Sequence, residues 1–327
     1  MKVKKSKAEK ARQYLEGLAL LSTKHRIYGA NSFIYLPIVQ NADDKIAKSA
    51  AKLFDGTIEK RDFEPAGEKG AYRQLLHQSL GAKYDDVTKS YDLIGNIAVI
   101  DAKGKAAKDI AKAVMSTNKN VETVISKGGA VSGKYRTRKY LHIMGKRNFV
   151  AHYKENGAEF KFDIRKTFFS SRLAYDRLRI AKLVGKNENV VVMFAGMGPF
   201  AIEIAKMHKD ANVVGIELNR SAYSYMKQNI SLNHLHNATA VLGDVGKVAH
   251  KYKGFADRII MPLPRDAYRF LGAALEMSKR KSTIHYYAFG DRESAFEDKI
   301  GQVKTFFAKR HRKIRIASKR IARQYSA

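Results

Sequence analysis

The sequence has no cysteine among its 327 residues, which excludes disulfide bridges, thiolate metal sites and a cysteine nucleophile. It has only five prolines, and we find no low-complexity linker and no internal repeat. No stretch approaches the roughly 18 apolar residues of a membrane-spanning helix, and no apolar signal region follows the basic segment 1–12. The ten histidines show no metal-ligand spacing. We therefore expect a soluble cytoplasmic protein with no metal site and no membrane contact.

Acidic residues are scarce, since 31 Asp and Glu stand against 62 Lys and Arg, which gives a net charge of +31 at pH 7. Such an excess repels itself in a compact chain and favours a polyanionic partner. Nucleic acid is the first candidate, an anionic membrane is the second, and plain solubility in a salty or hot cytoplasm is the third. Residues 130–182 hold 14 Lys or Arg among aromatic rings, and residues 303–323 hold nine with no acid. Cations beside aromatic rings suit RNA, whose phosphates bind cations and whose flipped bases stack on rings.

The order of helical and strand patterns predicts three parts. Residues 1–62 form a small α+β domain, with a helix over 8–21, a strand over 32–39 and a helix over 42–54. A Gly-, Pro- and charge-rich stretch over 56–72 is the best linker candidate. Residues 73–160 form a second α+β domain, whose expected elements are strands over 90–102, 121–126 and 139–144, a helix over 105–117, and a hairpin over 149–164 that turns at Asn156-Gly157.

Residues 161–327 form the third domain, in which short apolar strands alternate with helices. The strands are expected over 189–194, 211–218, 238–242, 258–263 and 283–289. This alternation is typical of a parallel α/β sheet covered by helices on both faces.

A glycine turn follows the first of these strands and opens a helix. Gly196 and Gly198 let the backbone approach a ligand closely, and the free amides of the helix start can hold an anionic group. Glu217 ends the next strand, where its carboxylate can accept hydrogen bonds from ribose hydroxyls, and Asp244 follows the third strand, where an adenine can be read. Ala201 replaces the third glycine of a dinucleotide fingerprint. The pattern therefore favours S-adenosylmethionine over a dinucleotide.

Several longer segments together resemble the archaeal and eukaryotic tRNA (guanine-37) N1-methyltransferases. The matching segments are distributed along almost the whole chain. They are 35–38, 91–95, 168–177, 194–200, 217–219, 261–264 and 284–287. The resemblance implies an α/β protein with a C-terminal Rossmann-like class I methyltransferase domain, preceded by two small α+β domains. It implies S-adenosylmethionine as donor and tRNA as substrate, with the first domain on the tRNA outer corner and the second helping to hold the anticodon stem-loop. We expect a monomer.

The resemblance also gives the expected site residues. The donor-binding set is Arg177, Phe194, Gly196, Gly198, Glu217, Leu218, Asp244, Val245 and Pro262, with Arg177 on the methionine carboxylate by analogy. The tRNA-binding set is Tyr135, Phe168, Arg172 and Pro264.

Methylation at N1 of guanine needs a base, because N1 carries a proton and is a poor nucleophile. Asp176 is the candidate base, and a guanidinium beside O6 would stabilise the negative charge that develops there. The family has a catalytic arginine in this part of the chain, and Arg136 and Arg138 are the two candidates. We expect these two to lie on a strand and only one of them to reach O6.

The sequence departs from the family pattern at three positions near this site. Val192 stands where the family has Asp, Pro262 stands where it has Asn, and Asp176 replaces a Glu. The family also continues past 324–326 into a last strand, so we expect that strand to be missing. Two alternatives stay open: a wyosine-pathway enzyme of the same fold that transfers a methyl or an aminocarboxypropyl group, and a catalytically weak tRNA-binding homologue.

Overall fold

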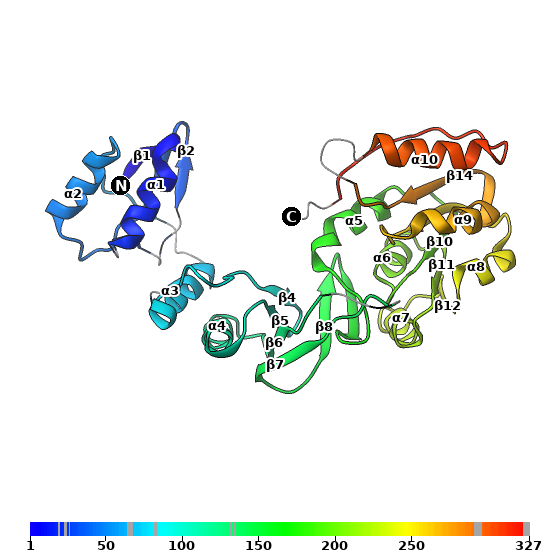
Figure 1. Cartoon of the computed structure of the whole chain (residues 1–327), viewed down its shortest axis with the longest axis horizontal. Helices are drawn as coiled ribbons and strands as arrows, with labels where there is room; N and C mark the ends of the chain where they lie inside the picture. Colours follow the sequence, from blue (N-terminus) through cyan, green and yellow to red (C-terminus); the bar gives the residue numbers. More distant parts are fainter. Residues whose placement is uncertain are drawn as a thin grey trace. The chain divides into compact units, whose positions relative to one another are not determined.

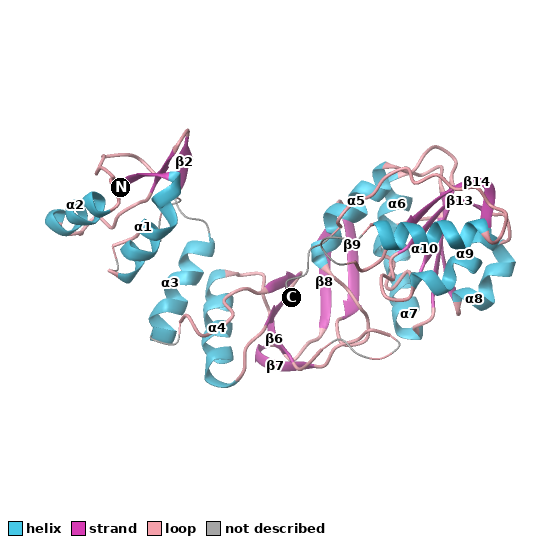
Figure 2. Cartoon of the chain, turned by 45° about the horizontal axis from the view of Figure 1, so that its top comes forward, coloured by secondary structure: helices cyan, strands magenta, loops and turns pink. Residues whose placement is uncertain are grey.

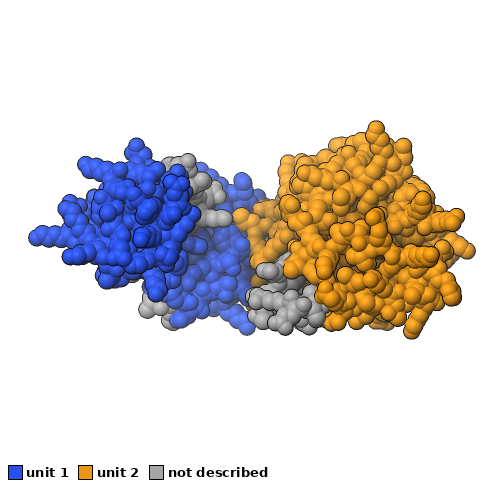
Figure 3. Space-filling view, turned by 90° about the horizontal axis from the view of Figure 1, so that it is seen from above, with its two compact units in different colours: residues 1–91, 98–126, 142–146 blue, residues 92–97, 127–141, 147–327 orange. Residues whose placement is uncertain are grey.

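The computed structural model describes residues 1–18, 20–22, 25, 27–63, 68–81, 84–130, 133, 135–290 and 296–322. The described residues form two compact units, drawn in different colours in Figure 3. Unit 1 comprises 1–91, 98–126 and 142–146, and unit 2 comprises 92–97, 127–141 and 147–327. Part of the linker expected at 56–72, and the whole of 324–326, lie outside the described residues. Among the described helices, none combines the length and apolar character needed to cross a membrane.

The N-terminal part of unit 1 is a three-stranded antiparallel sheet covered by two helices. Its elements are β1 (Lys2–Lys4), α1 (Lys5–Gly17), β2 (Tyr28–Ala30), β3 (Phe33–Tyr35) and α2 (Asp44–Leu53), and the strand order is β1-β3-β2. Leu15 and Leu36 are buried in its core, and Asp43 caps α2 by accepting hydrogen bonds from two backbone amides. Both expected helices are confirmed, although the first begins and ends earlier than its apolar pattern predicts.

The following sheet has the strand order β4-β5-β6-β7. The elements are α3 (Glu68–Leu80), β4 (Asp92–Ile94), β5 (Ile97–Ile100), α4 (Gly104–Thr117), β6 (Thr123–Lys127) and β7 (Tyr140–Gly145). The expectation of one strand over 90–102 is wrong, because the chain turns at Gly95, which has a φ of 59°. The backbone of His152 lies so close to Gly95 that no side chain fits there.

A hairpin opens the main part of unit 2. It consists of β8 (Val150–Glu155) and β9 (Ala158–Asp163), paired antiparallel. Asn156 and Gly157 connect the strands with φ values of 49° and 78°, as a two-residue turn with positive φ requires. The predicted hairpin is therefore confirmed.

A five-stranded parallel sheet forms the core of unit 2, in the order β12-β11-β10-β13-β14 (Figure 1). Its strands are β10 (Asn189–Met193), β11 (Asn212–Glu217), β12 (Ala238–Leu242), β13 (Ala256–Met261) and β14 (Ser278–Tyr286). The α-helices are α5 (Ala174–Lys182), α6 (Pro199–Met207), α7 (Arg220–Leu232), α8 (Val245–Val248), α9 (Leu271–Met277) and α10 (Glu297–Ala308). Short 3₁₀ helices are η2 (Ser171–Leu173), η3 (Ala249–Tyr252) and η4 (Ala267–Phe270). The predicted α/β class is confirmed.

Helices cover both faces of this sheet (Figure 2). Side chains of α8, α9 and α10 join one buried cluster with alternate residues of β10, β11 and β13. On the opposite face, Met226 of α7 packs against Gly215 of β11 and Gly198 at the start of α6. All strands are parallel, so the loops at their carboxyl ends meet along one edge of the sheet, where ligands bind in open α/β folds.

Candidate functional site

The glycine turn between β10 and α6 has the backbone that the sequence predicts. Phe194, Gly196 and Gly198 have φ values of 53°, 60° and 94°, and Pro199 occupies the first turn of α6. A Cβ on Gly198 would lie 2.9 Å from Met226 and 3.0 Å from Ile202. Glycine is therefore needed there both for its conformation and for its small size.

Glu217 fastens this turn to the end of β11. Its Oε2 accepts a hydrogen bond from the Gly196 amide at 2.7 Å, and its Oε1 accepts one from the Asn219 amide at 2.6 Å. Burial raises the pKa of Glu217, against the lowering effect of these backbone donors. Each oxygen keeps a second lone pair, so the carboxylate can also accept from the hydroxyls of a ribose.

The end of β12 lies beside Glu217, because the Gly243 amide donates to the Glu217 carbonyl at 2.9 Å. Asp244 follows and caps α8 by accepting from the Gly246 amide at 2.9 Å. Leu218 is half-buried next to Glu217, and Val245 is buried in the core cluster. Glu217, Leu218 and Asp244 thus lie along one edge of the sheet, whereas the Val245 side chain belongs to the packing below it.

The end of β13 contributes a short turn in which Pro262 and Pro264 are half-buried. The Leu263 amide donates to the Met261 carbonyl at 2.9 Å, and the Leu263 carbonyl accepts from Ala267 at 2.9 Å. Val192, where the resemblance expects an Asp, is fully buried in β10 and pairs with Ile260. An apolar side chain suits that position, since an unpaired carboxylate there would be strongly destabilising.

Asp176 lies in the first turn of α5 and is 3% exposed. One carboxylate oxygen accepts from Arg179 Nε at 2.8 Å, and the other accepts a short hydrogen bond from the Tyr287 hydroxyl. Tyr287 follows β14 and meets Phe200 of α6 edge to face, with 6.1 Å between ring centroids. Tyr287 thus joins the candidate base to the helix that the glycine turn opens.

The surroundings of Arg177 differ from the expected contact with the donor carboxylate. Its guanidinium is 2% exposed and donates two hydrogen bonds to Glu155 and one, at 3.1 Å, to the Ser170 carbonyl. The nearest Glu203 oxygen is 3.4 Å from Nε. Burial, followed by the neighbouring Glu155, raises the pKa of Glu203 to about 9, so Glu203 holds a proton at neutral pH. The Glu155 carboxylate and the Ser170 carbonyl therefore already bind this guanidinium in the structure.

Three of the four expected tRNA-binding residues, Tyr135, Phe168 and Arg172, precede α5 in the sequence and also belong to unit 2. Phe168 is next to the glycine turn, because a Cβ on Gly196 would lie 3.9 Å from the Phe168 carbonyl. The Arg136 guanidinium lies 4.8 Å from the centre of the Phe168 ring. Tyr135 is half-exposed, and Arg172 donates two hydrogen bonds to Asp92 at 2.8 and 3.0 Å.

Arg136 and Arg138 do not lie on a strand, so that expectation is wrong. Arg136 lies in a turn with a φ of 52°, and the strand β7 begins only at Tyr140. Both arginines are half-buried. Of the two, Arg136 is the one for which a contact beside the glycine turn is observed, through Phe168.

Sequence reasoning assigned no role to Tyr287, Glu155 or Glu203. Tyr287 meets Asp176 across 111 residues, and Glu203 accepts from Asn156 across 47, at 2.8 Å. No local spacing could have indicated either contact. His285, the residue two before Tyr287, is half-buried and accepts a hydrogen bond from Arg258 at 2.8 Å, and burial lowers its pKa to about 4.

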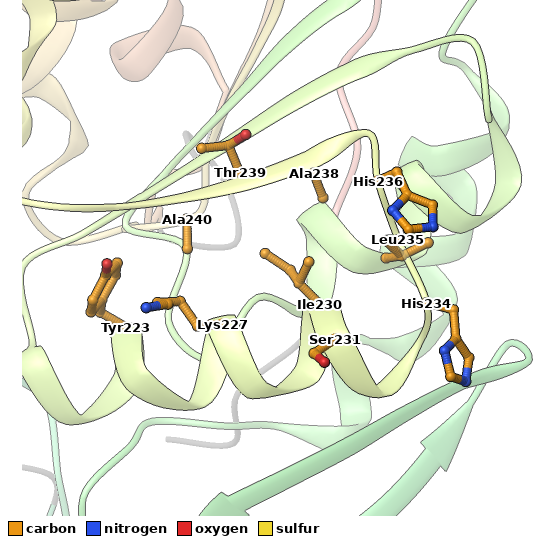
Figure 4. A pocket seen from close by; sticks show the side chains of 10 residues that line it. All are labelled: Tyr223, Lys227, Ile230, Ser231, His234, Leu235, His236, Ala238, Thr239 and Ala240. Atoms are coloured by element: carbon orange, nitrogen blue, oxygen red, sulfur yellow. The ribbon is translucent and has the colours of Figure 1, made fainter.

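A separate depression lies between α7 and the outer edge of β12 (Figure 4). It is lined by Tyr223, Lys227, Ile230, Ser231, His234, Leu235, His236, Ala238, Thr239 and Ala240. It shares no residue with the expected site, and the two histidine rings point in different directions (Figure 4). Among the described residues, no three His, Asp or Glu side chains gather in a way that could hold a metal ion.

Comparison with known proteins gives three family matches along the chain. The TRM5/TYW2 methyltransferase domain matches residues 151–316, the TYW2 N-terminal domain matches 72–148, and the tRNA methyltransferase 5 N-terminal domain matches 1–47. The first of these contains the parallel sheet and the glycine turn.

Individual relatives match over long stretches. The tRNA (guanine(37)-N(1))-methyltransferase Trm5b of Pyrococcus abyssi is 32% identical over the whole chain and 94% of its own length. Its crystal structure covers 99% of this chain and 94% of its own with a TM-score of 0.71 and 31% identity. The complex of aTrm5 with tRNALeu covers 100% of this chain and 95% of its own, with a TM-score of 0.68 and 30% identity. The tRNA 4-demethylwyosine(37)-methyltransferase Taw21 of Saccharolobus solfataricus is 34% identical over 62% of this chain and 78% of its own.

Proposed function

The chain belongs to the TRM5/TYW2 methyltransferase family, and we propose that it transfers a methyl group from S-adenosylmethionine to N1 of guanine 37 in tRNA. The observation that carries this proposal is the glycine turn fastened by Glu217, in a chain similar over its full length to tRNA (guanine(37)-N(1))-methyltransferases. The bound donor supplies the methyl group from its sulfonium centre.

The residues at the carboxyl edge of the sheet suit this donor. We propose that Gly196 and Gly198, which carry no side chain, let the donor approach the backbone of the turn closely, and that the Glu217 carboxylate accepts hydrogen bonds from the ribose hydroxyls of the donor. Asp244 lies beside Glu217, where its carboxylate can accept a hydrogen bond from the adenine amino group. Phe194, Leu218 and Pro262 would line the same edge, while Val245 supports it through packing.

Asp176 is the proposed base for the N1 proton of guanine. Tyr287 and Arg179 hold its carboxylate in one orientation, which favours proton removal along a fixed direction. Asp176 is only 3% exposed, so the bound guanine must displace some of the side chains packed around its carboxylate before the proton can be transferred. Arg136 lies beside Phe168 and is the proposed group that stabilises negative charge on O6.

Arg177 has a different role in this proposal from the one that analogy suggests. Its pairing with Glu155 and the Ser170 carbonyl joins β8, η2 and the start of α5. We propose that Arg177 orients the turn that carries Asp176, and that a contact with the donor would require it to leave Glu155.

Binding to tRNA is supported by the net charge of +31 and by the similarity to a protein solved with tRNALeu. Within this proposal, residues 1–62 contact the outer corner and 73–160 help to hold the anticodon stem-loop, with Tyr135, Phe168, Arg172 and Pro264 nearest the target base. A monomer and a cytoplasmic location stay predictions, and gel filtration tests the first of them.

The experiment compares which group is transferred. The purified chain is incubated with a tRNA transcript and with donor labelled either in its methyl group or in its carboxypropyl chain. We expect methyl label alone in the RNA. Carboxypropyl label would favour an aminocarboxypropyl transferase, methyl label only on tRNA carrying 4-demethylwyosine would favour a wyosine-pathway methyltransferase, and no label with tight tRNA binding would favour the inactive homologue.

A further inference from the structure

The segment that follows α10, residues 309–322, is exposed and basic; it turns over 309–311 and continues without a helix or strand. It contains seven Lys or Arg residues and no Asp or Glu. All its side chains are exposed except that of Ile314, which packs against the core cluster beneath α10. We call residues 309–322 the basic strap.

Both ends of the basic strap are attached to unit 2. Near its beginning, the Arg312 amide donates to the Phe307 carbonyl at 3.0 Å, and the Arg310 guanidinium lies 3.8 Å from the Phe306 ring centre. Near its end, Lys319 Nζ is 3.4 Å from a Glu297 oxygen. Because Phe307 and Glu297 lie at opposite ends of α10, the strap runs back along that helix (Figure 1).

The strap ends beside the proposed catalytic base. The Arg320 guanidinium lies 5.1 Å from the centre of the Tyr175 ring, and Tyr175 immediately precedes Asp176. Tyr175 is 67% exposed and Asp176 is 3% exposed, so the strap and this ring lie on the outer surface of the helix turn that carries Asp176. The strap therefore runs from the C-terminal end of α10 to the first turn of α5, which carries Asp176.

The central cations of the strap have no acidic partner in the part of the chain that the structure describes. Arg312, Lys313 and Arg315 are exposed, and no carboxylate of the described residues forms an ion pair with them. Lys313 and Arg315 are two positions apart, and a fully extended chain spans about 7 Å over two residues. This is similar to the spacing of neighbouring phosphates along a nucleic-acid strand.

We propose that the basic strap binds the phosphate backbone of the tRNA beside the methylated base. The inference rests on the proposed function, because it takes tRNA to be the substrate and Asp176 to mark the target position. RNA is favoured over an anionic membrane because the strap ends at the Tyr175 ring, next to the catalytic edge of the sheet. Fixed cations beside the site hold the strand on both sides of a flipped base.

The test neutralises the three unpartnered cations in the combined variant Arg312→Gln, Lys313→Gln and Arg315→Gln. The matched control is Lys209→Gln, Lys251→Gln and Lys253→Gln, which removes the same charge from exposed positions. These lysines precede β11 and β13 and so lie at the amino ends of the strands, whereas the proposed site lies at their carboxyl ends. Dissociation constants for a tRNA transcript are measured across a salt series by fluorescence anisotropy.

We expect the strap variant to bind tRNA about tenfold more weakly than wild type at moderate salt. The slope of log K against log salt should fall by about 2, since roughly 0.7 counterion is released for each phosphate contact with a single strand. The control should keep the wild-type slope within about 0.5. Donor affinity, measured by calorimetry, confirms that the strap variant is folded.

Each other outcome has a distinct meaning. A strap variant that binds tRNA like the control, while wild type still methylates guanine 37, overturns the strap and leaves the proposed function standing. Loss of binding to phosphatidylserine vesicles with an unchanged tRNA slope also overturns it, in favour of a membrane contact. A wild-type chain that neither binds nor methylates tRNA overturns both proposals together.

Discussion

Replacing Glu217 by glutamine exchanges one carboxylate oxygen for an NH₂ group, at a position where both oxygens already accept hydrogen bonds. The Gly196 and Asn219 amides donate to them at 2.7 and 2.6 Å. Whichever way the glutamine amide is oriented, its NH₂ group faces a backbone N–H, so one hydrogen bond is lost and two donors oppose each other.

The expected size of this effect follows from the charge and burial of Glu217. A hydrogen bond to a charged acceptor contributes about 1.5–3 kcal/mol, and a buried donor left without a partner adds to the loss. Part of this destabilises the glycine turn, and part is lost with the ribose hydroxyls. We expect the donor dissociation constant to rise about 10–100-fold, together with a thermal midpoint lower by a few degrees.

Isothermal titration calorimetry with S-adenosylmethionine or its demethylated product measures the affinity, and a thermal melt measures the stability. Glu276→Gln is the matched control, because Glu276 is exposed on α9 and lies away from the glycine turn. A Glu217→Gln protein that binds the donor as tightly as wild type would refute the assignment of Glu217 to the ribose.

Three further predictions concern α5 and its neighbours. Asp176→Asn should lower single-turnover methylation about 10²–10⁴-fold while donor affinity stays near wild type, and a wild-type rate would remove Asp176 from the reaction. Tyr287→Phe keeps the ring contact with α6 but removes the hydrogen bond to Asp176, so kcat should fall about tenfold with little change in KM for tRNA; an unchanged kcat would show that Tyr287 has no positioning role. The folded chain keeps a proton on Glu203 that the unfolded chain releases, so the free energy of unfolding should fall as pH rises from 4.5 to about 9. Urea titrations at several pH values should show a flatter decline for Glu203→Gln. Adding Glu155→Gln to that variant should lower the free energy of unfolding by about 3–5 kcal/mol, because the buried Arg177 is then left without a carboxylate. A decline as steep in Glu203→Gln as in wild type would contradict the account of Glu203.

Local signals were sufficient wherever a short stretch of chain determines its own structure. The hairpin at Asn156-Gly157 and the turn at Gly196 and Gly198 follow from residues that adopt positive φ easily. The strands of the parallel sheet follow from apolar runs buried on both faces, and four of the five lie within about two residues of their predicted bounds.

The fifth strand shows where such signals fail. The pattern predicts a strand over 283–289, but β14 spans Ser278–Tyr286. Its first residues are polar and exposed because β14 pairs only with β13 among the described residues, so no apolar pattern marks its beginning. An edge strand with one solvated side carries less of the hydrophobic signal than a central one.

The candidate site could be predicted only in part, for a related reason. Glycine and acid positions at strand ends are visible in the sequence, because the chemistry of a nucleotide site restricts residue types there. The contacts of Asp176 with Tyr287 and of Arg177 with Glu155 depend on how α5 packs against the sheet and the hairpin. The exclusion of Arg177 from solvent is a tertiary property, and no spacing in the sequence indicates it.

The central claim is the methylation of N1 of guanine 37, and nucleoside mass spectrometry of a treated tRNA transcript tests it most directly. A transcript with guanine 37 and one with adenine 37 are incubated with the chain and the donor, digested, and compared with authentic 1-methylguanosine. We predict 1-methylguanosine in the first transcript, mapped to position 37 in a nuclease fragment, and none in the second. A methylated nucleoside of another kind or at another position, or equal methylation of both transcripts, would contradict the account.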